Sequence, residues 1–197
     1  MKKKIYIDIN DTVREFSKQY IKYFNIAAID NKFNPDEVKY IENDLYSPFN
    51  FPSKKDKEDF EMDKFVFEVY GCAKPTHSAL PGNFNTWLND IQDENPQLEV
   101  WFISPGEYHT QRQATLFFLS KICSRVNGVY FPKSIRETWE ECDILITANP
   151  KFLADIPEGK NVIKIKTLYN KKIKSKYSSN NFMNIILEDN NLIKSLI

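Results

Sequence analysis

One stretch near the amino terminus restricts the fold of this chain more than any other. Residues 4–13 read Lys-Ile-Tyr-Ile-Asp-Ile-Asn-Asp-Thr-Val. The stretch begins as an apolar, β-branched run, which is typical of a short buried strand. A polar cluster follows, and from Thr12 apolar residues recur at spacings of three and four, which predicts a helix over residues 12–24. This order puts Asp8 at the carboxyl end of the strand, where open α/β sheets bind their ligands.

The polar side chains of the predicted first helix all fall on one side. Its apolar face is expected to pack against the sheet, as in any amphipathic helix. The opposite face is filled by basic and polar residues, namely Arg14, Lys18, Gln19 and Lys22. We therefore expect a structural role for this helix, with these four side chains on its outer face.

Length and composition indicate one globular domain, or one domain with a modest insertion. The chain has 197 residues, of which 42% are hydrophobic and 27% charged, so it can bury a proper core. Lys plus Arg equals Asp plus Glu, at 27 each, so net charge gives no argument for nucleic-acid binding. The widely spaced Cys72, Cys123 and Cys142 form no Cys-x-x-Cys. No apolar run approaches the roughly 20 residues of a membrane helix, so a cytoplasmic protein is predicted.

Residues 25–80 differ from the rest because they contain no strong buried-strand pattern. Pro35 marks a helix start, and Ser53 is a candidate N-cap for a helix over residues 54–70. The apolar side of this second helix is aromatic, with Phe60, Phe65, Phe67 and Tyr70. These rings either form the small core of a helical insertion, which we favour, or stack on a nucleobase.

The remainder of the chain alternates between helices and buried strands, which favours an α/β fold with a parallel sheet. Helices are predicted over residues 80–94, 107–123 and 134–142. Strands are predicted over residues 98–103, 128–131, 143–148 and 161–166, the last as the final strand of the sheet. The strand over 98–103 delivers Ser104 to its carboxyl end, and Lys133 follows the short strand over 128–131.

Several of these residues together resemble motifs of the haloacid dehalogenase-like (HAD-like) superfamily. Residues 8–12, Asp-Ile-Asn-Asp-Thr, resemble its first motif, Asp-x-Asp-x-Thr or Val, and the strand that ends in Ser104 resembles the second. The layout around Ser104 and the pair Tyr169-Asn170 resemble the 5'(3')-deoxyribonucleotidase branch. The resemblance implies a Rossmann-like HAD core, residues 1–24 and 81–197, with a small helical cap insertion over residues 25–80.

The resemblance also implies roles for individual residues. Asp8 would attack phosphorus to give a phospho-aspartate, and Ser104 would hold a phosphoryl oxygen. Lys133 is the candidate for the lysine of the third motif, although a solvated surface lysine is an equal alternative. Magnesium would be bound by Asp8 and by the backbone carbonyl of Asn10.

Two departures from the family pattern affect this chemistry. The second Asp of the first motif is Asn10, whose side chain cannot transfer a proton at neutral pH. Loss of general acid–base catalysis typically costs a factor of roughly 10² to 10⁴. The Asp pair of the fourth motif is replaced by Thr147-Ala148, so magnesium binding is expected to be weak or absent. Asp11 could be proposed as the missing acid. It is a weak candidate, because its side chain should point elsewhere.

We therefore expect a HAD-like protein that is catalytically inactive and serves a binding or structural role. The alternative is a magnesium-dependent phosphatase of the 5'(3')-deoxyribonucleotidase type that acts through a phospho-aspartate at Asp8. Expected partners are other proteins, as in a multi-subunit assembly, with Phe49, Phe51 and the basic tail as contact candidates. A nucleotide is a further possible ligand. The richness in Lys, Asn and Ile is common in phages, which makes a virion component the second hypothesis for location.

Overall fold

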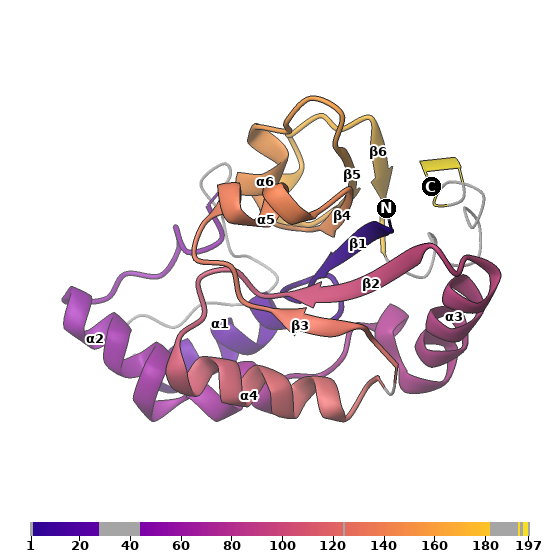
Figure 1. Ribbon diagram of the computed structural model, residues 1–197. Coiled ribbons are helices and arrows are strands. Elements are labelled where there is room, and N and C mark those ends of the chain that lie inside the picture. The colour runs from indigo at the N-terminus through magenta and orange to yellow at the C-terminus, as the bar shows by residue number, and fades with distance from the viewer. Residues whose placement is uncertain (1, 28–43, 124, 182–192, 194, 197) are drawn as a thin grey trace.

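A parallel sheet forms the centre of the molecule (Figure 1). The computed structural model describes residues 2–27, 44–123, 125–181, 193 and 195–196. Within these ranges the sheet has six strands in the order β3-β2-β1-β4-β5-β6, and every neighbouring pair is parallel. The strands are β1 (Lys3–Asp8), β2 (Leu98–Ile103), β3 (Gly128–Tyr130), β4 (Ile144–Thr147), β5 (Asn161–Ile165) and β6 (Tyr177–Ser179).

Helices connect the strands and cover the sheet. The α-helices are α1 (Phe16–Ala27), α2 (Lys54–Asp59), α3 (Pro81–Glu94), α4 (His109–Ser120), α5 (Ile135–Glu141) and α6 (Pro150–Ala154). Shorter π-helical and 3-10 turns are η1 (Phe60–Lys64), η2 (Phe67–Gly71), η3 (His77–Ala79) and η4 (Leu168–Asn170). No described helix is both long and apolar enough to cross a membrane.

The buried middle of the central strands is mostly apolar because both faces of the sheet are covered. Successive side chains of a strand point to opposite faces, and the two hydrophobic clusters follow this alternation. Ile5 and Ile7 of β1 belong to the cluster that includes α3, whereas Tyr6 between them belongs to the cluster of α5 and α6. The predicted α/β fold, a parallel sheet flanked by helices, is therefore confirmed.

The sheet order brings three predicted strand ends together. β1 lies between β2 and β4, and its last residue, Asp8, is in register with Ile103. Ser104 follows Ile103 directly, and Ala148 follows the end of β4. The prediction that Asp8, Ser104 and Ala148 lie at the carboxyl ends of neighbouring strands is confirmed.

Two sequence-based predictions about the elements were wrong. The strand over residues 161–166 is not the last of the sheet, because β6 adds a further parallel strand beside β5. The first helix begins at Phe16 and not at residue 12. Ahead of it lies a tight turn, in which the Ile9 carbonyl accepts from the backbone N–H groups of Val13 and Arg14, and Asp11 has a positive φ of 54°.

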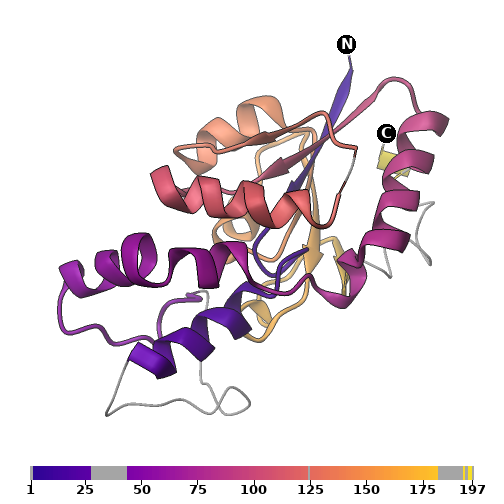
Figure 2. The ribbon, with the colours of Figure 1, turned by 90° about the horizontal axis from the view of Figure 1, so that it is seen from below.

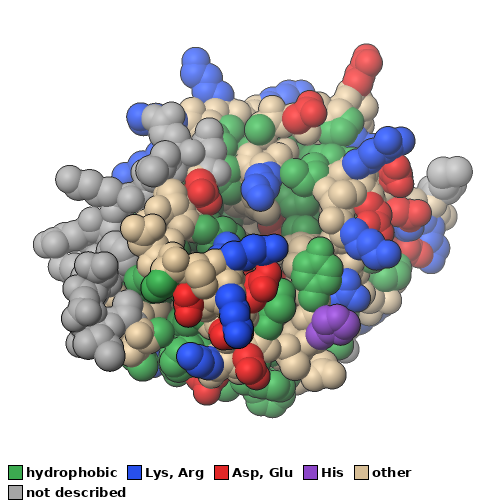
Figure 3. Space-filling view, turned by 90° about the vertical axis from the view of Figure 1, so that its left-hand side faces the viewer, with side chains coloured by type: hydrophobic (Ala, Val, Ile, Leu, Met, Phe, Trp, Pro, Cys, Tyr) green, Lys and Arg blue, Asp and Glu red, His purple; other side chains and the backbone are tan. Residues whose placement is uncertain are grey.

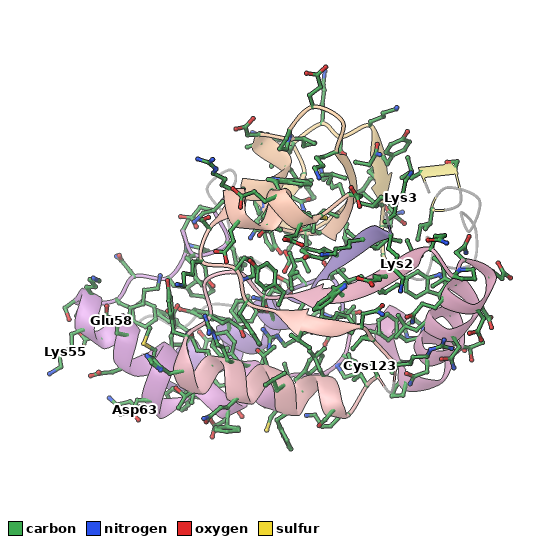
Figure 4. The ribbon with its side chains drawn as sticks, viewed as in Figure 1. Lys2, Lys3, Lys55, Glu58, Asp63 and Cys123 are labelled. Atoms are coloured by element: carbon green, nitrogen blue, oxygen red, sulfur yellow. The ribbon has the colours of Figure 1, made fainter. Side chains whose placement is uncertain are left out.

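Residues 54–71 form a helical segment beside α1 and α4 (Figures 1 and 2). Ser53 caps α2 as predicted, since its hydroxyl accepts from the backbone N–H of Asp56. Lys55 and Asp63 are exposed and lie on the outer side of this segment (Figure 4). The helix predicted from Pro35 falls outside the described residues. The division into a core and a cap insertion over residues 25–80 stays a prediction.

An aromatic cluster joins the helical segment to α1. Its rings are closely packed, with centroid separations of 4.6 Å for Tyr20–Phe49 and 5.1 Å for Tyr20–Phe60. The rings therefore form a core between the segment and α1, which agrees with the interpretation that we favoured. The expectation that Phe49 offers a protein contact was wrong, because its side chain is buried in this cluster, and Phe51 packs against it.

The aromatic cluster gives the first testable prediction. Phe60→Ala should destabilise the protein by about 3–5 kcal/mol, because it removes a buried ring and leaves a cavity. Phe67→Ala is the matched control, since the Phe67 side chain is 44% exposed and should cost well under about 2 kcal/mol. Urea unfolding of both variants measures the difference. Equal losses would mean that the cluster is not the structural core of this part of the molecule.

Candidate functional site

The site begins where β1 and β4 end side by side. Asp8 is only 1% exposed, and Thr147 beside it is fully buried. The Thr147 hydroxyl donates a 2.6 Å hydrogen bond to Oδ2 of Asp8. The same hydroxyl oxygen accepts from the backbone N–H of Asn149 at 2.9 Å, which leaves its hydrogen for Asp8. Thr147 therefore holds the Asp8 carboxyl group in place.

The electrostatic state of Asp8 is set mainly by its burial. Desolvation raises the pKa of Asp8 to about 7, because a charged carboxylate loses its hydration inside the protein. The hydrogen bonds from Thr147 and from the backbone of Asn10, and the positive charge of Arg14, act in the opposite direction. The Asp8 carboxyl group is therefore partly protonated near neutral pH.

Arg14 lies fully buried next to these strand ends. Its Nε and one Nη2 hydrogen both donate to Oδ1 of Asn10. Its Nη1 group donates to the Tyr70 carbonyl at 2.8 Å and to the Thr115 hydroxyl at 2.7 Å. The remaining Nη2 hydrogen donates to Oε1 of Glu107 at 2.7 Å. A guanidinium group has five N–H donors, and all five are used.

The Arg14–Glu107 pair compensates two charges that would be expensive to bury singly. Glu107 is only 4% exposed, and aromatic rings surround the guanidinium carbon at 5.2 Å for Tyr70 and 5.5 Å for Phe118. Oε2 of Glu107 has no hydrogen-bond partner among the described residues. The pair thus supplies one acceptor atom that no described residue satisfies.

Sequence analysis missed this pair. Arg14 was predicted on the outer face of the first helix, and that prediction was wrong because Arg14 belongs to the turn before α1. Glu107 was assigned to the start of a helix, but α4 begins two residues later, at His109. A local signal could not have paired them, because 93 positions separate the two residues.

Asp11 is turned away from Asp8, as expected. Its Oδ1 accepts from the backbone N–H and the hydroxyl of Ser17, at 2.9 and 3.0 Å. Its Oδ2 accepts from the Tyr169 hydroxyl at 2.8 Å. With both oxygens engaged, Asp11 anchors α1 and η4 and does not line the pocket described next.

A pocket of about 560 Å³ opens at the carboxyl ends of the strands. Asp8, Asn10 and Lys133 line it, so the structure brings three of the predicted site residues around one space. Ser104 is buried at the neighbouring strand end, and its hydroxyl has no partner among the described residues. Figure 3, which views the molecule from this end, shows basic and acidic side chains mixed around a hollow.

The structure also settles which fourth-motif position faces Asp8. Ala148 is fully buried in the apolar cluster that includes α3, whereas Thr147 points to Asp8. Asp143, the acid that remains in this stretch, lies before β4, where its side chain accepts from the backbone N–H of Lys4 at 2.9 Å. The sequence-based argument that Asp143 is too far to replace the missing acids agrees with this position.

The candidate magnesium ligands at the strand ends are the Asp8 carboxylate and the Asn10 backbone carbonyl. Magnesium is usually held by one or two carboxylates together with other hard oxygens. Here one Asp8 oxygen accepts from Thr147, and the end of β4 carries Thr147 and Ala148 in place of a second acid. Within the described ranges, no group of three or more His, Cys, Asp or Glu side chains is placed to hold a metal ion.

A prediction concerns the buried charge of Arg14. Arg14→Met should cost about 3–5 kcal/mol of stability, because Glu107 would stay buried without its partner. Arg125→Met is the control: its ion pair with Asp93 is exposed, and such pairs contribute about 0–1 kcal/mol. Chemical denaturation measures both. A loss in Arg14→Met as small as that of the control would contradict the assigned role.

The raised pKa of Asp8 gives a prediction about pH. The folded-state pKa of about 7 exceeds the ordinary value of 3.8, so the folded state binds the proton more tightly. Proton binding by Asp8 therefore stabilises the folded state. This stabilisation is complete below about pH 4 and is lost as pH rises through 7. Asp8→Asn cannot ionise and does not show this loss. The unfolding free energy of the variant minus that of the native protein should therefore be larger at pH 8 than at pH 4, by on the order of 1–3 kcal/mol.

Urea unfolding at the two pH values measures this difference. Asp93→Asn, at an exposed position, should show almost none of it. A stability difference between Asp8→Asn and the native protein that does not change with pH would contradict a raised pKa.

Comparisons with known proteins agree with this architecture. No family model matches the sequence, and no curated protein matches it. Similar solved structures include CbbY from Rhodobacter sphaeroides in complex with phosphate (12% identity, TM-score 0.58, covering 94% of this chain and 96% of that chain). Another is a predicted haloacid dehalogenase-like hydrolase from Bacteroides fragilis (11% identity, TM-score 0.61, 94% and 100% covered). At these identities the likeness concerns the fold alone, and the fold of this chain is that of the HAD-like hydrolases.

Proposed function

We propose that this chain uses a HAD-like fold for binding and does not transfer phosphoryl groups. The observation that carries the proposal is the hydrogen bond from Thr147 to Asp8. In the reaction that the family resemblance implies, the Asp8 carboxylate attacks phosphorus. The Thr147 hydroxyl contacts Asp8 from the strand end where the resemblance implies a metal-binding acid, so the nucleophile lacks the second carboxylate of that reaction.

The position of the general acid supports the same proposal. Asn10 has no titratable side chain, and its amide oxygen accepts two hydrogen bonds from Arg14. The amide is therefore held as a structural acceptor and cannot protonate a leaving group. Loss of acid–base catalysis by itself lowers a rate by a factor of roughly 10² to 10⁴.

The binding role rests on the pocket. Its volume of about 560 Å³ falls in the range of roughly 300–1,000 Å³ that is usual for small-molecule sites. Aromatic side chains contribute to its walls, among them Tyr46, Tyr70, Tyr108 and Phe152. Such walls suit an organic ligand, and a nucleotide is among the ligands that they would accommodate.

Contacts with other proteins are the second part of the proposal. Phe49 and Phe51 belong to the aromatic cluster and do not support this part of the proposal. Its support comes from other apolar side chains, on α4 and η2. Leu116 and Phe117 are each 47% exposed, and the Phe117 ring lies 6.4 Å from that of Phe67. Exposed apolar side chains that gather in this way are typical of protein-binding surfaces.

An activity assay tests the proposal. The purified protein is incubated with deoxynucleoside monophosphates and with p-nitrophenyl phosphate in the presence of magnesium, next to the Asp8→Asn variant. We expect equal phosphate release from both, at the background rate. Release by the native protein that is lost in Asp8→Asn would replace this proposal with the alternative, a magnesium-dependent phosphatase of the 5'(3')-deoxyribonucleotidase type.

A further inference from the structure

Two strong donor groups on the deep side of the pocket, those of Arg14 and Gln111, are already used by the protein. All five N–H groups of Arg14 bind protein acceptors. The side-chain amide of Gln111 donates to the Tyr70 hydroxyl at 3.1 Å and to the Glu61 carbonyl at 3.4 Å. The guanidinium group and the Gln111 amide are therefore engaged elsewhere, and the donors left for an anion include the uncharged Asn10 amide and the Ser104 hydroxyl.

Acceptors, by contrast, are left over. Oε2 of Glu107 is buried without a partner among the described residues, and Glu107 lines the pocket. Asp8 lines the same pocket and brings a second carboxyl group. A buried acceptor without a hydrogen bond costs about 1–3 kcal/mol, which a ligand that donates to it would recover. The free Glu107 oxygen therefore favours a group that donates hydrogen bonds. Because Arg14 compensates the charge of Glu107, the preference for positive charge comes from Asp8, which forms no salt bridge within the described residues.

The mouth of the pocket has the opposite character. Lys54 and Lys57 form ion pairs with acids of the helical segment. Lys133 and Lys151 also line the pocket, and their ammonium groups form no salt bridge within the described part of the chain. Against these two cations stands one exposed carboxylate without a salt bridge, Asp44, so the described part of the mouth carries a net positive charge. This charge favours an acidic group on the outer end of a ligand.

We propose that this pocket binds a small zwitterion, with its primary ammonium group inward at Glu107 and Asp8 and its acidic group outward near Lys133 and Lys151. The inference rests on the proposed function, because it assumes that the pocket is a binding site. It reverses the polarity that the family resemblance implies. A phosphate at the same depth would face two carboxyl groups and no free side-chain donor of Arg14 or Gln111.

Isothermal titration calorimetry on the native protein tests the ligand class. The compounds are γ-aminobutyrate and ε-aminocaproate as zwitterions, n-butylamine and butyrate as their separate halves, and inorganic phosphate. We expect at least one zwitterion to bind, more tightly than butylamine, and we expect butyrate and phosphate to bind most weakly. Saturable binding of phosphate or butyrate without binding of any amine would overturn the proposal, and so would the absence of binding by every amine.

Variants test the two ends of the pocket separately. Glu107→Gln keeps an oxygen for Arg14 and removes the charge, so affinity for both zwitterion and butylamine should fall by about tenfold or more. Glu140→Gln, the same change at an exposed residue of α5, is the matched control and should bind as the native protein does. Lys133→Ala should weaken binding of the zwitterion and leave butylamine unchanged.

The outcomes separate this inference from the proposed function. Zwitterion affinity that is unchanged in Glu107→Gln, or lowered equally for both compounds in Lys133→Ala, refutes the assigned orientation. If Glu107→Gln does not fold, the order of affinities in the native protein and the Lys133→Ala comparison still decide. Hydrolysis of phosphate esters would refute the proposed function but leave the calorimetric result unchanged, whereas failure of amine binding leaves a catalytically inactive protein with another ligand.

Discussion

The buried guanidinium group of Arg14 is the interaction on which this part of the structure depends. It links the turn after β1, the end of the helical segment, α4 and the loop after β2 through Asn10, Tyr70, Thr115 and Glu107. A buried charge is tolerated only when it is paired and fully hydrogen-bonded, and these five bonds meet that condition. The positions of the four elements around the pocket are therefore coupled to one another.

In the proposed function, the same interactions occupy groups that phosphoryl transfer would use. The Asn10 amide is an acceptor for Arg14, and the Asp8 carboxyl group is an acceptor for Thr147. A fold can outlast the chemistry of its site, because the packing of sheet and helices does not depend on the catalytic groups. Here the apolar strands preserve the sheet, while side chains at the strand ends form the hydrogen-bonded network on which the proposed binding role rests.

The polarity of the pocket follows from this network. The donors of Arg14 and Gln111 are directed to protein acceptors, and one carboxylate oxygen of Glu107 on the deep side has no partner among the described residues. Lysine side chains stand at the mouth. A site with acceptors inside and cations outside selects ligands by the direction of their dipole. This directional preference distinguishes it from a site that is built to bind an anion.

The sequence by itself determined the parallel sheet and the position of Asp8 and Ser104 at the ends of neighbouring strands. Continuous apolar runs that alternate with helical periodicity specify buried parallel strands, and the first motif marks the strand end. The three-residue β6, Tyr-Ser-Ser, was missed because it lacks such a run. The sequence also showed that Asn10 and Thr147-Ala148 stand where acids were expected. Each of these features is written in a few consecutive residues.

Only the tertiary structure decided what those residues contact. Periodicity placed Arg14 on a helix face, and this was wrong. The turn that precedes α1 depends on hydrogen bonds to the Ile9 carbonyl, which apolar periodicity does not reveal. The choice of Thr147 over Ala148 as the side chain that faces Asp8 depends on the register of β4 against β1. The pairing of Arg14 with Glu107 joins residues that are distant in sequence, and charges of this kind find their partners only when the chain has packed. Local patterns therefore specified the elements and their order, whereas the long-range packing of the chain determined the chemistry of the pocket.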